Sequence, residues 1–140
     1  MFNYPLMKKT FLVIVLFIGF LKAGAQTDTL FWFAAPEVSI STSTFDRPIV
    51  LRITPASQAA TVTISQPAGG GMPNQVVSIP AGSTQTVDLS AWIDIIENKP
   101  ADAVLNYGLK IQSTAPVTAY YEVVSVQCQC NPEIFVLKGQ

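Results

Sequence analysis

Histidine is absent from this chain of 140 residues, and charged side chains make up only 12% of it. Histidine is the commonest general base near neutral pH and the commonest zinc ligand, so its absence removes the usual chemistry of many hydrolases and zinc enzymes. Serine and threonine nucleophiles need such a base beside them, and no motif supplies one. The composition therefore favours a protein that is not an enzyme and that binds no cofactor.

Positive charge is also scarce. Three of the eight basic residues, Lys8, Lys9 and Lys22, precede residue 26, so five basic and nine acidic residues follow, a balance of −4. A nucleic-acid-binding surface needs a stripe of Lys and Arg, so we expect no nucleic-acid partner. Apolar residues make up 49% of the chain, an ordinary share that favours a folded domain over disorder.

Residues 1–25 have the order of a secretory signal peptide. Lys8 and Lys9 precede an apolar run over residues 11–21. Ala23 and Ala25 then form an A-x-A cleavage site before Gln26. As a helix this run would be roughly 16 Å long, about half of the ~30 Å hydrocarbon core of a bilayer. We therefore predict a signal-peptide helix cleaved before Gln26, a secreted or cell-surface protein, and no membrane span in the mature chain.

Short β-type runs separated by Pro, Gly, Ser and Asn follow the leader. In residues 60–65 the alternation is strict, with Val62 and Ile64 on one face and hydroxyl side chains on the other, which indicates a half-buried strand. The other predicted strands cover residues 30–34, 48–54, 75–79, 84–89, 105–113, 117–126 and 133–137. This spacing predicts an all-β domain over residues 26–140, an antiparallel β-sandwich that is Ig-like or jelly-roll-like.

The connections between these runs also have recognisable patterns. The Gly- and Pro-rich residues 67–73 read as a flexible loop, and residues 114–116, which end in a proline, read as a turn between two strands. Ser90 is placed to cap one helical turn over residues 91–97, which Pro100 ends.

Acidic side chains are the remaining reactive groups. Asp94 and Glu97 are three residues apart on the predicted helical turn and would share a face. Paired carboxylates can hydrolyse glycosides, but a solvated helix face is the interpretation that we favour. No calcium-loop or phosphate-loop pattern is present. We predict no catalytic, cofactor-binding or metal-binding residue.

Cys128 and Cys130 are the two cysteines of the chain. In a strand, the Cβ atoms of residues i and i+2 lie roughly 6–7 Å apart, against ~3.8 Å in a disulfide, so a bridge between them needs a turn. Three states stay open: a local disulfide or two inert free thiols, bonds to another chain, and redox or metal chemistry. The first is favoured.

Six segments, taken in order, resemble one bacterial group of exported surface proteins. They are DTLFWFAAPEV (28–38), RPIVLRIT (47–54), IPAGSTQTVDL (79–89), IENKP (96–100), GLKIQSTAPVTAYYE (108–122) and NPEIFVLKG (131–139). The group, found mostly in Bacteroidota, has a domain similar to the N-terminal region of IgGFc-binding protein. The resemblance implies an extracellular β-rich module of larger adhesion-like proteins, and it implies no catalytic residue.

Members of that group continue far beyond the matching segments, so the resemblance also implies that this chain is a fragment whose sandwich is incomplete at the C-terminus. A Cys-x-Cys before Asn131 departs from the expected pattern. If strands are missing, residues 133–137 would form an unprotected edge, and we expect the isolated chain to self-associate.

Aromatic side chains are the candidate contact residues. Trp32 lies between Phe31 and Phe33, so a strand places Trp32 on the face opposite to the two phenylalanines, which we expect in the core. Trp32 and Trp92 are the candidate contact aromatics, because tryptophan is enriched at binding surfaces. We predict a non-enzymatic interaction or adhesion module that binds a protein or glycan ligand, or adjacent domains of a longer homologous protein. The alternative is a carbohydrate-binding accessory domain of a secreted hydrolase, with Trp32 or Trp92 as the stacking platform.

Overall fold

The computed structural model describes residues 26–37, 48–100, 102–123 and 133–140. Gln26, which follows the predicted cleavage site, is exposed. The signal-peptide helix with Ala23 and Ala25, and both Cys128 and Cys130, lie outside the described residues.

The described residues form an all-β fold, as the sequence predicts, and its large sheet is antiparallel. Its elements are β1 (Asp28–Phe33), β2 (Ala35–Pro36), β3 (Ile49–Pro55), β4 (Ala60–Ser65), β5 (Gln75–Ile79), β6 (Gln85–Asp88), η2 (Ser90–Trp92), α2 (Ile93–Ile96), β7 (Glu97–Asn98), β8 (Leu109–Val123) and β9 (Glu133–Val136). Strands β4 and β5 have the predicted bounds, because both are regular runs between Pro, Gly and Asn residues.

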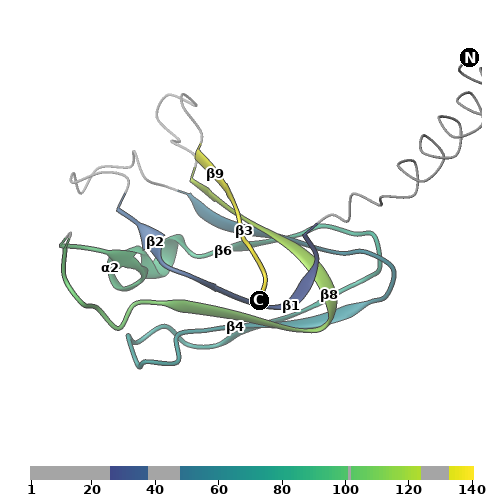
Figure 1. Cartoon of the computed structure of the whole chain (residues 1–140), viewed down its shortest axis with the longest axis horizontal. Coiled ribbons are helices and arrows are strands. Elements are labelled where there is room, and N and C mark those ends of the chain that lie inside the picture. Colours follow the sequence, from purple (N-terminus) through teal and green to yellow (C-terminus); the bar gives the residue numbers. More distant parts are fainter. Residues whose placement is uncertain (1–25, 38–47, 101, 124–132) are drawn as a thin grey trace, which may run out of the picture.

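Strand β8 organises the large sheet, whose path β5-β4-β8-β3-β6 is joined by β1 and β9 on β8. The first half of β8 pairs with β4 on one side and β1 on the other, and the second half pairs with β3 and β9. Figure 1 shows β8 as a long curved strand with β1, β3, β4 and β9 arranged around it. The sheet therefore wraps around one core and is nearly barrel-shaped.

The predicted division of this region is wrong: β8 is a single strand that begins at Leu109, where the sequence predicts strands over residues 105–113 and 117–126 with a turn at residues 114–116. Its burial alternates without a break across this segment. The pairing with β4 ends at Ser113 and the pairing with β3 begins at Val117. Pro116 therefore lies between the two ladders, where its missing N–H interrupts neither of them.

The core is made by the inward residues of these strands. Phe31 is fully buried and Phe33 packs against the core, as their alternation with Trp32 predicts. Tyr121, near the C-terminal end of β8, is also buried, and the centre of its ring lies 5.4 Å from that of Phe33 and 5.9 Å from that of Phe135 on β9. These three rings join β1, β8 and β9 inside the sheet, in the geometry that aromatic pairs prefer.

The helical turn forms where it is predicted, but Ser90 does not cap it. The hydroxyl of Ser90 accepts a hydrogen bond from the backbone N–H of Ile49 (2.9 Å), and no side chain caps η2 or α2. Ser90 therefore attaches the turn to β3, a contact between residues 41 positions apart. In the described part of the chain, no helix is both long enough and apolar enough to cross a membrane.

The Gly-rich segment after β4 is fixed in place, where the sequence predicts a flexible loop. Gln66 is buried, and its side-chain Oε1 accepts a hydrogen bond from the N–H of Met72, which is itself buried (3.0 Å). The Nε2 of Gln66 donates to the carbonyl oxygens of Ile95 (2.6 Å) and Tyr107 (3.3 Å). One amide thus links the loop to α2 and to the segment that precedes β8.

Candidate functional site

Trp32 is the predicted contact aromatic that the structure places on the surface. It lies on the outward side of β1, and 46% of the residue is exposed. Its register partner on β8 is Lys110, whose Nζ lies over the indole ring, 5.8 Å from the centroid. This cation–π contact fixes the ring against the sheet and leaves much of it open to a ligand.

Trp92 is placed differently. It ends η2, is only partly exposed, and packs against the hydrophobic core. The sequence could not separate the two tryptophans, because Trp92 is in a short helical segment whose orientation is set by contacts with β3.

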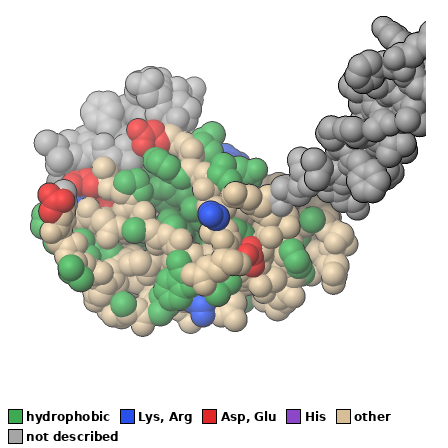
Figure 2. Space-filling model, viewed as in Figure 1, with side chains coloured by type: hydrophobic (Ala, Val, Ile, Leu, Met, Phe, Trp, Pro, Cys, Tyr) green, Lys and Arg blue, Asp and Glu red, His purple; other side chains and the backbone are tan. Residues whose placement is uncertain are grey.

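A second group of apolar side chains is exposed along β8 and β9. Tyr120, Ile134 and Val136 are 36%, 60% and 62% exposed on the outward face of the sheet, and we call them the β9 surface. Phe135, which is 38% exposed, lies on the opposite face beside Tyr121. Tyr120 pairs with Val136 in the sheet register, so their side chains are direct neighbours. Figure 2 shows hydrophobic side chains gathered over β9.

An ion pair borders the β9 surface. Arg52 of β3 binds Glu122 of β8, and Glu122 is the register partner of Ile134. The surface is therefore apolar at β9 and charged toward β3, an arrangement that resembles the apolar centre and polar rim of a protein interface.

The backbone of β9 is also accessible along one edge. Leu137 donates its N–H to Ala119 on β8 (3.0 Å), so the alternation of an antiparallel ladder turns the backbone groups of Ile134 and Val136 away from β8. Among the described strands, β9 pairs with β8 alone. Such an edge is a template for another strand.

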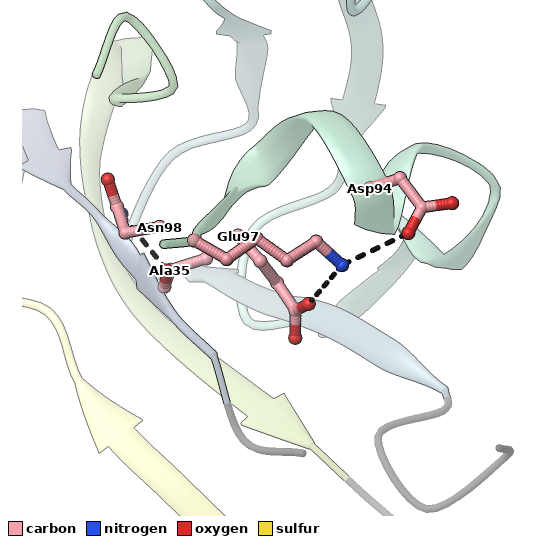
Figure 3. Close-up of polar contacts among 5 residues, drawn as sticks. Ala35, Asp94, Glu97 and Asn98 are labelled. Atoms are coloured by element: carbon pink, nitrogen blue, oxygen red, sulfur yellow. Dashed lines mark hydrogen bonds and ion pairs between the residues drawn. The ribbon is translucent and has the colours of Figure 1, made fainter. Parts of the chain in front are cut away.

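Acidic residues meet a lysine at the end of α2. The Lys99 ammonium donates to Asp94 (3.1 Å) and to Glu97 (3.3 Å), as Figure 3 shows. Burial by itself would lower the pKa of Lys99, but the hydrogen bonds and negative charges of the two carboxylates outweigh it, and the pKa is raised. The expectation of a solvated pair is wrong for Glu97, which is fully buried, whereas the side chain of Asp94 is 78% exposed.

This cluster connects two elements and has the character of a structural anchor. Glu97 and Asn98 form β7, which pairs in parallel with β2, and the Asn98 amide donates to the carbonyl oxygen of Ala35 (3.0 Å; Figure 3). The buried carboxylate thus lies where α2, β7 and β2 meet. No three acidic or sulfur ligands gather into a metal site within the described ranges.

A hollow of about 330 Å³ lies at the end of β4 and β5. Thr61, Ser78 and Thr114 line it together with four apolar residues, Ala59, Ala60, Ile79 and Pro80, and the N–H of Thr61 donates to the Thr114 hydroxyl (2.9 Å). The sequence offers no signal for this hollow, because its residues come from three strands that only the sheet register brings together.

No family model matches the chain, and no curated protein matches it. A solved structure, described as the crystal structure of Thermotoga maritima 1070, is similar to it with a TM-score of 0.46 and 14% sequence identity, over 85% of this chain and 97% of that one. A likeness this distant carries no residue role and no activity to the present chain. The resemblance to exported surface proteins therefore stays a prediction.

Proposed function

We propose that the chain is an exported, non-enzymatic interaction or adhesion module located at the cell surface or outside the cell. The observation that carries this proposal is the β9 surface, where three large apolar side chains are exposed on one face of two neighbouring strands. Clustered exposed apolar residues mark contact surfaces on soluble domains. The resemblance to adhesion-like proteins and the signal-peptide pattern of residues 1–25 support the same proposal.

The contact region is tested by photo-crosslinking from the purified chain. A benzophenone amino acid replaces Val136 in one sample and Thr86 in another, since Thr86 is exposed on β6 at the opposite border of the sheet. Cell-surface glycoproteins and the chain itself are the targets. We expect discrete adducts from position 136 and far fewer from position 86. Equal labelling from both positions, or none from position 136, would overturn the proposal.

The export step is tested separately. The whole chain is expressed in a bacterium, and the mass of the protein outside the inner membrane is measured. Cleavage before Gln26 is expected, and an uncleaved chain retained in the cytoplasm would contradict it.

A second candidate function, a carbohydrate-binding accessory domain, is favoured by the half-exposed Trp32 and by the hollow at the far end of β4 on the same sheet. The carbohydrate-binding function would use a surface other than the β9 surface, so both functions can be tested in the same protein.

A further inference from the structure

The outward side of β1, β8 and β4 forms one polar face around Trp32. In the sheet register, Trp32 pairs with Lys110 and Lys110 with Ser65, which makes one row across three strands. In the next outward row, Gln112 of β8 lies between Thr63 of β4 and the half-buried Leu30 of β1. We call these six residues the Trp32 face.

The Trp32 face has donors and acceptors but little charge. Ser65 and Thr63 each present a hydroxyl, and Gln112 presents an amide with two donors and an acceptor. Lys110 is the one charged member, and its ammonium is already engaged over the Trp32 ring. A surface of this kind, with Trp32 and the half-buried Leu30 as its apolar members, matches an uncharged ligand that is rich in hydroxyl groups.

The face continues into the hollow at the far end of β4 and β5. Thr61, which lines the hollow, is two residues from Thr63 and four from Ser65, so these three side chains point outward from one strand. Two such steps cover about 13 Å along the strand. An elongated ligand can therefore contact the Trp32 ring at one end and, at the other, the hollow with its three hydroxyl-bearing residues and its apolar side chains.

We propose that the Trp32 face and the hollow together form a binding site for a neutral polysaccharide chain. One sugar ring stacks its C–H groups on the indole of Trp32, whose face carries negative quadrupole charge. Gln112 and Thr63 hydrogen-bond to the hydroxyls of the following sugar, and the hollow receives the next. This inference rests on the second of the two proposed functions and names its ligand class and contact residues.

The test is a titration of the purified chain with cellohexaose, xylohexaose, mannohexaose and maltohexaose, followed by calorimetry and tryptophan fluorescence. Hexagalacturonate serves as the anionic probe. We expect at least one neutral hexasaccharide to bind, and Trp32→Ala to weaken that binding at least about tenfold, or about 1.4 kcal/mol. Thr63→Val, which removes a hydroxyl with little change of shape, should weaken it by about three- to tenfold.

The inference is overturned if the chain binds no hexasaccharide or binds hexagalacturonate alone. It is also overturned if Trp32→Ala binds the neutral hexasaccharide as tightly as the unchanged chain does. Circular dichroism establishes whether each variant folds. If Trp32→Ala does not fold, the outward substitution Thr63→Val still tests the inference. Tyr120→Ala, on the β9 surface, is the matched aromatic control and should bind as the unchanged chain does.

The same variants separate this inference from the interaction module. Trp32→Ala should keep its crosslinks from position 136, and Val136→Lys should keep its hexasaccharide affinity. Loss of one activity without the other identifies which of the two proposals fails.

Discussion

Replacing Gln66 by Met removes one buried amide and leaves the side-chain volume almost unchanged. The amide makes three hydrogen bonds: it accepts from the N–H of Met72 and donates to the carbonyl oxygens of Ile95 and Tyr107. Gln66 is 6% exposed, so water replaces few of these bonds in the variant. The substitution therefore tests whether this amide holds the Gly-rich loop against α2.

The expected loss of stability follows from these three contacts. At about 1 kcal/mol for each hydrogen bond, the free energy of unfolding falls by about 3 kcal/mol. The bond to Tyr107 is the longest, at 3.3 Å, and contributes least, whereas the buried N–H of Met72 loses its partner and adds a desolvation cost. For a domain of this size, the melting temperature should fall by roughly 10 °C.

Denaturant and thermal unfolding of residues 26–140 measure this loss, with Gln75→Met as the matched control. The Gln75 amide also donates to a backbone carbonyl, that of Pro73 (2.8 Å), but this contact is exposed. The control should cost less than about 0.5 kcal/mol. Equal costs for the two variants would refute the role of Gln66 in fixing the loop.

Three further predictions concern the loop, the ion pair and the edge strand. Gly70→Ala should destabilise the fold by about 1–3 kcal/mol in denaturant unfolding, because its new Cβ would overlap the side chain of Gln66. Lys99→Met should cost about 1–3 kcal/mol, because it removes a partner of the buried Glu97. Folding raises the pKa of Lys99 above its usual value of 10.5, so the stabilisation by the charged ammonium is complete below pH 10.5 and is lost at higher pH. The unfolding free energies of Lys99→Met and the unchanged chain should therefore converge above about pH 10.5. Val136→Lys should reduce concentration-dependent self-association in sedimentation equilibrium, and a monomeric unchanged chain at high concentration would contradict the role of this edge.

Local patterns in the sequence predict much of the fold. The bounds of β4 follow from strict alternation, those of β5 from its position between Asn74 and Pro80, and the inward direction of Phe31 and Phe33 from their spacing around Trp32. These properties depend on the two-residue period of an extended chain, which any strand imposes on its own neighbours. The exposure of Trp32 follows from the same period.

Other properties depend on contacts between residues far apart in the chain. Pro116 reads as the end of a turn, yet β8 continues through it, because the ladders of β3 and β4 end on either side. Ser90 reads as a helix cap, yet its hydroxyl binds Ile49. Neither the continuation of β8 through Pro116 nor the Ser90–Ile49 hydrogen bond can be predicted from neighbouring residues, because the partners in both cases belong to other strands.

The candidate sites divide in the same way. The amino-acid sequence is sufficient to predict an all-β chain, a tryptophan on an outward face and a surface with little charge. Three properties appear only once the chain is folded: Glu97 is buried beside Lys99, Trp92 packs against the core, and Thr61 lies beside Thr114. Burial and register are set by pairing across the sheet, and this pairing joins residues that no local pattern relates.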